Sequence, residues 1–521
     1  MARALMVMGT ASHVGKTLMV AALCRILRQD GYRVAPFKAQ NMSRNAALTA
    51  DGRELSRAQA MQAEAAGVPP DVHMNPLLLK PTNAHAAQLI VQGRAVSEVQ
   101  ARQYMADPKH DLWTAVVDSY RALDRQFDVL VIEGAGSPVE MNLKDRDLAN
   151  MRVAALAQAP VMLVADIERG GVFAAVVGTL SLLAPEERQR VRGVVINKFR
   201  GDPTLFDDGV RLLEERTQTP VWGVVPYIPD LWLDEEDSMG LEADRYRRAA
   251  RGDVRVAIVL LPHIANFTDF DALFWDPSVD AAFVRRPEAL ADADAVILPG
   301  TKNTLDDLAW LRAAGWLRAL EEARTRGAAI LGICGGFQML GRAVRDPERL
   351  ESSREVVEGL GWMTMDTTLR SPKRTTWVSG RLAGAWGGIP VAGYEMHMGQ
   401  SRWQGSRPAP LAEVKGPGEV AWRDEGAVLD AGAVIGTYLH GIFDDGGFRD
   451  WWLQLVRRRR GMSAAPRPAL PMAAVKEEAY DRLAAVVRAH LAMPAIYRAL
   501  AVEPRGAGPI IEKTLGEYRK G

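Results

Sequence analysis

The chain has little of what marks several large classes of protein. Its 521 residues include only two cysteines, Cys24 and Cys334, so a disulfide framework is excluded and a reducing, cytoplasmic location is expected. The longest apolar stretch, Val153 to Ala165, has 13 residues and contains Gln158 and Pro160. A membrane-spanning helix needs about 18 to 20 apolar residues. We therefore expect a protein with no membrane partner.

An excess of charge of either sign is also absent. Lys and Arg number 64, Asp and Glu number 64, and the formal net charge is zero. Proteins that coat nucleic acid carry a basic excess, so no nucleic-acid partner is expected. The four arginines at 457–460 are expected to form a solvated helix end. At about 150 residues per domain, the length predicts three or four domains.

What the chain does contain is a regular alternation of short apolar runs with helical patterns. Runs rich in Val, Ile and Leu are typical of strands buried on both faces of a parallel sheet. Such runs lie at 4–8, 127–136, 159–167, 191–199, 254–261, 294–300, 328–333 and 433–439. Helical spacing of apolar residues follows the first run and recurs around 303–326 and 473–488. This rhythm predicts doubly wound α/β domains.

A glycine-containing loop follows the first predicted strand and opens a predicted helix, in MVMGTASHVGKTLMV at 6–20. Backbone amides in such a loop cradle phosphate oxygens. Lys16 can reach the β and γ phosphates, and the Thr17 hydroxyl can ligate Mg²⁺. Gly9, Thr10 and Gly15 complete the loop, although the usual spacing places glycine where Thr10 stands. The sequence predicts a nucleotide site, and the alternative is a glycine turn with a chance Lys-Thr pair.

A nucleotide site that performs chemistry also needs a carboxylate near the metal. Glu133, in VIEGAGSP, and Asp166, in VADIERGG, each come at the end of an apolar strand. Each is a candidate metal-linked group and each could instead cap a loop; we favour Glu133. Asn197, in VINKF, also ends a strand and is a candidate for contacting the nucleotide base, its alternative being a turn-forming residue.

The second half carries a candidate nucleophile in LGICGGFQMLG at 331–341. A strand is predicted to end before Cys334, and Gly335 begins a helix, which is the arrangement of a nucleophile elbow. The helix N-terminus favours the thiolate, and the backbone N–H of Gly335 is placed to stabilise an oxyanion. Cys24 instead lies inside a predicted helix and is interpreted as a packed, inert thiol.

A catalytic cysteine needs a base. His440, in GTYLHGIFD, ends a predicted strand, is followed by Gly441, and could point across the top of the sheet toward Cys334. His397, in GYEMHMG, is the competing candidate. Strand-end placement favours His440.

Together these motifs resemble the cobyric acid synthase family, the glutamine-hydrolysing amide ligases of cobalamin biosynthesis. The resemblance covers nearly the whole chain. Its most specific stretches are PFKAQNMSRNAA (36–47), VIEGAGSPVEMNL (131–143), VADIERGGVFA (164–174), VINKFRGD (195–202), LPGTKNT (298–304), LGICGGFQMLG, GYEMHMG and GTYLHGIFD. The first half is similar to a dethiobiotin-synthetase-type P-loop domain, in which a shifted first glycine is usual.

The resemblance implies an α/β fold with two doubly wound domains. These are a P-loop NTPase-like parallel sheet over 1–232 and a flavodoxin-like class I glutamine amidotransferase domain over 254–456. The charged stretch 233–253 would link them, and 457–521 would form a short helical C-terminal extension.

The resemblance also implies residue roles. Cys334 would be the nucleophile and His440 the base, with Gly300 or Thr301 supplying a second backbone donor to the oxyanion. Many class I amidotransferases carry Glu two residues after the histidine, where this chain has Ile442; Glu395 or Asp444 are candidates to orient His440 instead. The candidate substrate-binding residues, whose alternative is a merely ordered loop, are Lys38, Gln40, Asn41 and Asn45.

The implied reaction uses ATP, Mg²⁺ and L-glutamine. The P-loop domain would activate carboxylates b, d, e and g of adenosylcobyrinic acid a,c-diamide, a corrinoid, as acyl phosphates. Ammonia from glutamine would then attack them. The alternatives are the related cobyrinic acid a,c-diamide synthase, a non-enzymatic P-loop ATPase switch, and a regulatory binding protein with inactive sites.

Overall fold

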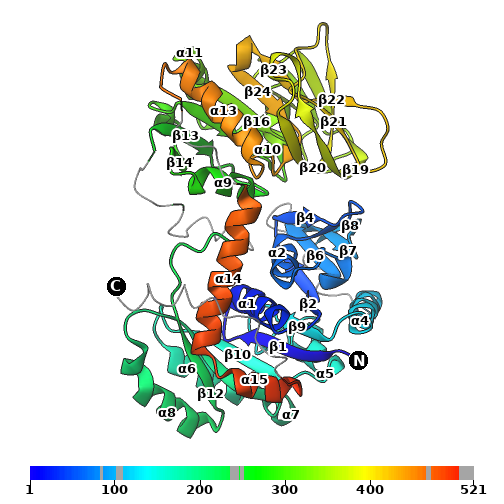
Figure 1. The fold of residues 1–521 in the computed structure, drawn as a ribbon. Coiled ribbons are helices and arrows are strands. Elements are labelled where there is room, and N and C mark those ends of the chain that lie inside the picture. Colours follow the sequence, from blue (N-terminus) through cyan, green and yellow to red (C-terminus); the bar gives the residue numbers. More distant parts are fainter. Residues whose placement is uncertain (82–85, 101–109, 235–245, 247–251, 465–470, 504–521) are drawn as a thin grey trace.

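The computed structural model describes the chain except for residues 82–85, 101–109, 235–245, 247–251, 465–470 and 504–521. The predicted linker at 233–253 lies largely outside the described residues. The fold is α/β with two mainly parallel sheets, as the sequence predicts, together with a seven-stranded mixed sheet and smaller sheets (Figure 1).

The first half is built on a six-stranded parallel sheet in the order β12-β11-β10-β1-β9-β2. Alternate residues of β1 face opposite sides, because side chains alternate along a strand: Leu5 and Val7 join one core, and Met6 and Met8 join the other. The strands are β1 (Arg3–Gly9), β2 (Val34–Phe37), β9 (Val129–Glu133), β10 (Val161–Asp166), β11 (Val191–Phe199) and β12 (Val221–Pro226).

Helices cover both faces of this sheet, as a doubly wound fold requires. They are α1 (Lys16–Gln29), α4 (His110–Asp124), α5 (Met151–Leu156), α6 (Val172–Leu182), α7 (Pro185–Arg188) and α8 (Asp207–Thr217). Cys24 lies in α1 with no exposed surface, and burial raises the pKa of its thiol. The interpretation of Cys24 as a packed thiol is confirmed.

An insertion between β2 and α4 forms a four-stranded sheet, a hairpin and a helix that the apolar runs did not predict. The sheet has the order β3-β6-β7-β8, and β4 pairs with β5. The elements are β3 (Gln40–Met42), β4 (Ala46–Leu48), β5 (Glu54–Ser56), α2 (Arg57–Ala66), β6 (Leu77–Pro81), β7 (Ala86–Val91) and β8 (Arg94–Gln100). In Figure 1 this insertion lies between the first parallel sheet and the second half of the chain.

The second half contains a six-stranded sheet in the order β14-β13-β15-β16-β24-β23, parallel except at β23. The strands are β13 (Val254–Val259), β14 (Val279–Val284), β15 (Ala295–Leu298), β16 (Ala329–Ile333), β23 (Ala427–Leu429) and β24 (Val434–Thr437). The helices are α9 (Asp271–Trp275), α10 (Thr304–Ala313), α11 (Trp316–Thr325), α12 (Gly335–Met339) and α13 (Gly446–Arg459). The predicted helix at 303–326 is two helices, because Gly315 adopts a φ of +79° between them.

A seven-stranded, mostly antiparallel sheet completes the second half, and the apolar runs do not predict it. Its path is β18-β17-β19-β20-β25, with β17 and β19 parallel and β21 and β22 attached beside β19. The strands are β17 (Ala343–Arg345), β18 (Val356–Glu358), β19 (Met365–Leu382), β20 (Pro390–Trp403), β21 (Ala412–Lys415), β22 (Arg423–Glu425) and β25 (Leu439–His440). The short strand β25 carries His440 to the edge of this sheet.

The C-terminal helix α14 (Met472–His490) joins the cores of both halves, and α15 (Met493–Leu500) packs in the core of the first. Met472 and Val475 pack in the core of the second parallel sheet. Leu483 and Val487 pack against α1 in the core of the first. In Figure 1, α14 runs from the upper half of the molecule down to the lower half.

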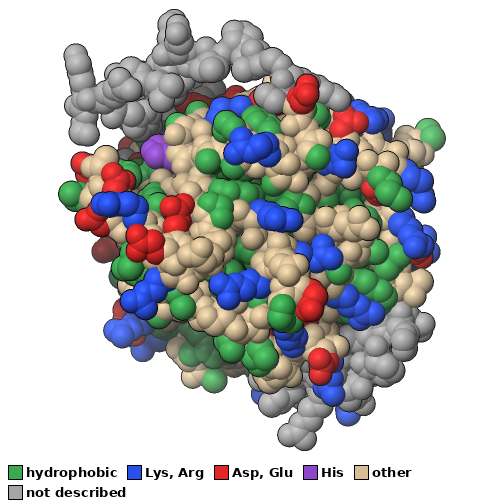
Figure 2. Space-filling view, turned by 90° about the horizontal axis from the view of Figure 1, so that it is seen from below, with side chains coloured by type: hydrophobic (Ala, Val, Ile, Leu, Met, Phe, Trp, Pro, Cys, Tyr) green, Lys and Arg blue, Asp and Glu red, His purple; other side chains and the backbone are tan. Residues whose placement is uncertain are grey.

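The surface carries both basic and acidic side chains. On the face drawn in Figure 2, basic and acidic side chains are interspersed with hydrophobic ones. Within the described residues, no helix is both long enough and apolar enough to cross a membrane. The four arginines end α13 as predicted, but Arg457 is buried and paired with Asp253 rather than solvated.

Candidate active sites

Cys334 stands at the turn between β16 and α12, as the nucleophile-elbow pattern predicts. Its backbone has φ +51° and ψ −107°, a conformation that side chains other than glycine rarely adopt and that costs about 1 to 3 kcal/mol. The turn is tight because Gly336 packs on β15: a Cβ added there would lie 1.9 Å from the carbonyl oxygen of Leu298. The strained turn holds the thiol at the carboxyl edge of the sheet.

His440 and Asp269 form a buried pair beside this thiol. Nδ1 of His440 lies 2.6 Å from Oδ2 of Asp269, and both side chains are 2% exposed. The second oxygen of Asp269 accepts from the backbone N–H of Gly441 at 3.0 Å. Burial lowers the pKa of His440, but Asp269 and Cys334 more than offset this and raise it to about 10. The ring is therefore held ready to carry a proton.

The competing histidine has different surroundings. His397 also lines the pocket at Cys334, but its Nδ1 faces the carbonyl of Gly399 at 2.8 Å. Its ring stacks on Tyr438 with centroids 3.9 Å apart. Burial lowers the pKa of His397 to about 4. A histidine that stays neutral at ordinary pH and lacks a carboxylate partner on Nδ1 is less suited to pair with a thiolate.

The carboxylates suggested from sequence to orient His440 are engaged elsewhere. Glu395 pairs with Arg374 at 2.5 Å and Arg423 at 2.8 Å. Asp444 lines a polar pocket together with Arg57, Lys476 and Asp269, whereas Nδ1 of His440 faces Asp269. The carboxylate that contacts His440 is therefore Asp269, and not Glu395 or Asp444 as expected. The motifs do not predict Asp269. Asp269 lies in a short 3-10 helix, η6 (Phe267–Phe270), after β13, and no spacing rule distinguishes it from the neighbouring aspartates.

The two backbone segments expected to form an oxyanion hole lie against each other. A Cβ added to Gly335 would come 3.3 Å from the backbone nitrogen of Thr301. A Cβ added to Gly300 would come 2.8 Å from Cε1 of His440 and 3.7 Å from Cβ of Cys334. Only glycine at position 300 leaves room for the histidine ring. Asp307 secures this segment by accepting from the Thr301 hydroxyl at 2.5 Å.

A pocket opens at Cys334 and receives side chains from both halves of the chain. The second half contributes Lys302, Lys373 and Glu351, and the first half contributes Arg44 and Lys80. Cationic side chains suit the carboxylate of an amino-acid substrate, and a carboxylate suits its ammonium group. The arrangement can therefore bind a zwitterion beside a nucleophilic sulfur.

The predicted phosphate loop lies at the carboxyl edge of the first sheet. Gly15 adopts a φ of +97° and precedes α1, so the loop can turn its amides inward. The ammonium group of Lys16 donates to the carbonyl oxygens of Ala11 at 2.9 Å and Gly136 at 3.0 Å. The Lys16 side chain thus folds back over the loop and bridges it to the segment after β9.

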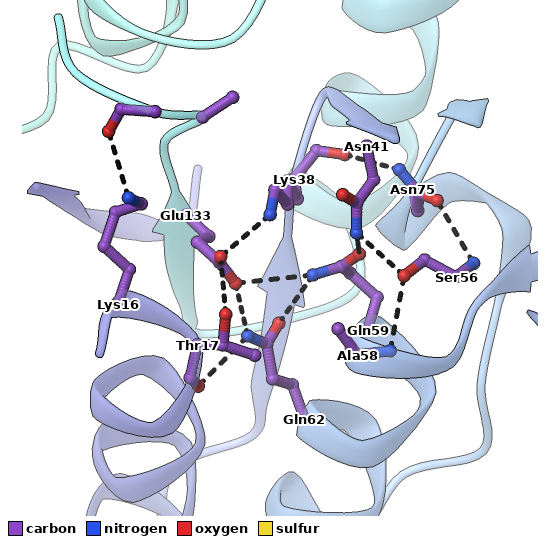
Figure 3. Close-up of polar contacts among 12 residues, drawn as sticks. Lys16, Thr17, Lys38, Asn41, Ser56, Ala58, Gln59, Gln62, Asn75 and Glu133 are labelled. Carbon is purple, nitrogen blue, oxygen red and sulfur yellow. Dashed lines mark hydrogen bonds and ion pairs between the residues drawn. The ribbon is translucent and has the colours of Figure 1, made fainter. Parts of the chain in front are cut away.

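Glu133 is fully buried at the end of β9 and accepts from several side chains (Figure 3). The Thr17 hydroxyl donates to it at 2.9 Å, and Lys38 forms an ion pair with it at 2.9 Å. Gln62 donates at 2.6 Å and Gln59 at 3.4 Å, both from α2. The structure brings Glu133 to Thr17, as the metal hypothesis requires.

Thr17 and Glu133 fit a magnesium ion by their chemistry. Both offer oxygen, which Mg²⁺ prefers, and Mg²⁺ usually takes only one or two protein ligands beside water and phosphate oxygens. Among the described residues, no group of three or more His, Cys, Asp or Glu side chains could hold a metal ion.

The candidate substrate-binding residues lie inside the insertion rather than on an open surface. Lys38 faces Glu133, and Asn41 donates to Ser56 at 2.8 Å and Gln59 at 2.9 Å. Asn45 is 1% exposed, and Gln40 is partly exposed in β3. These contacts hold α2 beside the phosphate loop. They favour the alternative interpretation, in which these residues order a loop of the chain.

Asp166 and Asn197 line the same edge. Asp166 pairs with Lys198 at 2.9 Å and caps the backbone of Glu168, so it serves as a loop cap. Asn197 donates to the carbonyl oxygen of Val14 in the phosphate loop at 2.8 Å. Asn197 therefore supports the loop from the neighbouring strand.

Two domain families match the chain. The CobQ/CobB/MinD/ParA nucleotide binding domain matches residues 5–241, and the CobB/CobQ-like glutamine amidotransferase domain matches residues 255–448. The two matches fall on the two halves that carry the phosphate loop and the cysteine elbow.

Several proteins named cobyric acid synthase match almost end to end. The protein from Pelotomaculum thermopropionicum is 49% identical over 98% of this chain and 100% of its own length. That from Klebsiella pneumoniae is 49% identical over 95% of this chain and 98% of its own. That from Moorella thermoacetica is 48% identical over 94% of this chain and 96% of its own.

Proposed function

The chain belongs to the cobyric acid synthase family, a family of amidotransferase ligases, and from that membership we propose that it converts adenosylcobyrinic acid a,c-diamide to cobyric acid. ATP and glutamine would drive the amidation of the b, d, e and g carboxylates. The observation that carries the proposal is a cysteine elbow with a His440–Asp269 pair and a phosphate loop in one chain.

At the cysteine site, His440 takes the proton of the Cys334 thiol, and the thiolate attacks the amide carbon of glutamine. The developing oxyanion is stabilised by backbone N–H groups of Gly335 and the Gly300 segment. The protonated His440 then gives its proton to the departing nitrogen, which leaves as ammonia. Water hydrolyses the glutamyl thioester and restores the thiol. Asp269 holds the ring in the required orientation throughout.

At the phosphate loop, Lys16 and the loop amides hold the ATP phosphates, and Thr17 and Glu133 would hold Mg²⁺. Bound Mg²⁺ neutralises phosphate charge during transfer. A substrate carboxylate oxygen attacks the γ phosphorus, ADP leaves, and an acyl phosphate forms. Ammonia attacks the acyl carbon and phosphate leaves, because phosphate is a better leaving group than a carboxylate oxygen.

Replacing Cys334 with Ala tests the two-site proposal. We expect loss of glutamine-dependent amidation and retention of ammonia-dependent amidation, because only the nitrogen supply is removed. Cys24→Ala is the matched control, since the Cys24 thiol is fully buried in the core of the first sheet; it should keep both activities. Loss of both activities in a folded Cys334→Ala protein would contradict the proposal.

Replacing Lys16 with Met tests the proposed role of the phosphate loop. We expect loss of amidation from either nitrogen source, while the hydrolysis of glutamine measured without nucleotide continues. Mass spectrometry of the corrinoid product then tests the substrate: product amidated only at a and c would identify the alternative diamide synthase. ATP hydrolysis with no corrinoid product under any condition would favour the non-enzymatic switch.

A further inference from the structure

The helix α2 contacts both candidate sites although it belongs to the first half of the chain. Its first residue, Arg57, donates to the phenol oxygen of Tyr394 at 2.8 Å. The Tyr394 ring stacks on His440, with centroids 5.3 Å apart and planes 22° apart. Tyr394 is 2% exposed. A residue of the first half therefore reaches the proposed glutaminase base through one aromatic ring.

The same helix holds the carboxylate beside the phosphate loop. Gln62 donates to Glu133 at 2.6 Å and to the carbonyl oxygen of Thr17 at 3.2 Å. Gln59 donates to Glu133 at 3.4 Å (Figure 3). The helix has only ten residues, so its two groups of contacts belong to one rigid unit.

We propose that Arg57 is a positioning residue that sets the plane of the His440 ring and links it, through α2, to the phosphate-binding loop. The inference rests on the proposed function, since it concerns the glutaminase base. The hydrogen bond to Asp269 fixes one edge of the imidazole but leaves its tilt free. Stacking on Tyr394 restricts that tilt, and Arg57 holds the phenol in place.

The link to the phosphate loop follows from what nucleotide binding must change. Thr17 donates its hydroxyl hydrogen to Glu133, and both oxygens belong to the proposed metal site. Under the proposed function, nucleotide binding would redirect these oxygens and so shift the Glu133 carboxylate to which Gln59 and Gln62 donate. Since α2 is short and rigid, a shift at those residues also moves Arg57.

The test compares Arg57→Met, Tyr394→Phe and the double variant, with glutamine hydrolysis measured with and without ATP and corrinoid. Tyr394→Phe keeps the stacked ring and removes only the phenol oxygen. We expect each single variant to lower kcat about tenfold or more with little change in KM, since misplacing a reacting group by about 1 Å costs this much or more. Hydrolysis should also lose its response to ATP and corrinoid.

The double variant should be no slower than either single variant, because both remove the same contact. Arg25→Met is the matched control: it removes ion pairs between α1 and α14, with Glu477 and Asp481, and should leave kcat unchanged. Additive losses, a retained ATP response, or an equal loss in Arg25→Met would each overturn the inference. If the wild-type protein shows no Cys334-dependent hydrolysis, the proposed function fails instead, which separates the two.

Discussion

At the scale of single residues, hydrogen-bond partners decide which histidine suits the chemistry. His440 and His397 both line the pocket at Cys334, yet the pKa of His440 is raised to about 10 and that of His397 is lowered to about 4. The difference follows from Asp269, a carboxylate on His440, compared with the carbonyl of Gly399 on His397. At neutral pH only His440 can stay protonated beside a thiolate.

Asp269→Asn should show this directly. We expect kcat for glutamine hydrolysis to fall by about 100-fold or more, since a proton-transferring base contributes about that much. The carboxylate raises the pKa of His440, so its removal lets the ring lose its proton at lower pH. The basic limb of the pH profile, expected near pH 10 in the wild type, should therefore move downward. Stopped assays of glutamate release from pH 6 to 11 would measure it.

The same exchange two residues away is the control. Asp271 accepts from the Tyr246 hydroxyl at 2.5 Å, so Asp271→Asn should leave the basic limb in place. The His440–Asp269 pair also makes folding stability depend on pH. Because the pKa of His440 is raised on folding, the pair stabilises the folded protein fully below about pH 6.5. This stabilisation is lost as pH rises through about 10. An unshifted pH profile in Asp269→Asn would contradict the role of Asp269.

Motifs predicted residue types better than they predicted contacts. Cys334 and Lys16 are recognisable because a tight turn after a buried strand admits few residue choices. Asp269 was missed because its partner lies 171 positions away in the sequence. The sequence predicts that Lys38 binds a carboxylate of the substrate, whereas in the structure Lys38 forms an ion pair with Glu133. A sequence shows which charged side chains are present but not which groups they contact.

At the scale of elements, apolar runs predict four strands of each six-stranded sheet, because these strands are buried on both faces. They do not predict the partly exposed outer strands β12 and β14, nor the short strands β2 and β23. They also do not predict β19 and β20, which are long, partly exposed and paired antiparallel. Half-exposed strands carry no continuous apolar run, and their pairing is a long-range property. The helix at 473–488 was predicted, but periodicity could not say that it packs on α1.

Leu483→Ala should show that α14 stabilises the first half. Leu483 is 2% exposed and packs with α1 residues in the core of the first sheet. Removing a buried leucine side chain costs about 2 to 5 kcal/mol. We expect a lower denaturation midpoint in urea, followed by tryptophan fluorescence. Glu478→Ala, at an exposed position of the same helix, should change stability by no more than about 0.5 kcal/mol. Equal midpoints for the two variants would contradict this packing role.

At the scale of the whole molecule, the contact between the halves encloses the cysteine site. Apolar residues of the insertion pack on β20 in one small core, with Ala46, Leu48, Leu78 and Ile90 against Tyr394 and Met396. Glu54 bridges Lys80 of the insertion and Lys373 of β19 with contacts of 2.8 and 2.7 Å. Arg44 and Lys80 of the first half line the pocket at Cys334, so ammonia formed there under the proposed reaction would be released next to the first half.

This enclosure predicts that nitrogen passes between sites of one molecule rather than through solvent. A mixture of Cys334→Ala and Lys16→Met proteins contains one intact site of each kind, but on different chains. With glutamine as donor and an ammonia-consuming dehydrogenase in excess, the wild type should still form amidated corrinoid and the mixture should form none. Without the dehydrogenase, the mixture should regain activity as free ammonia accumulates. Equal inhibition of the wild type and the mixture would show that ammonia escapes the enclosed pocket before it meets the acyl phosphate.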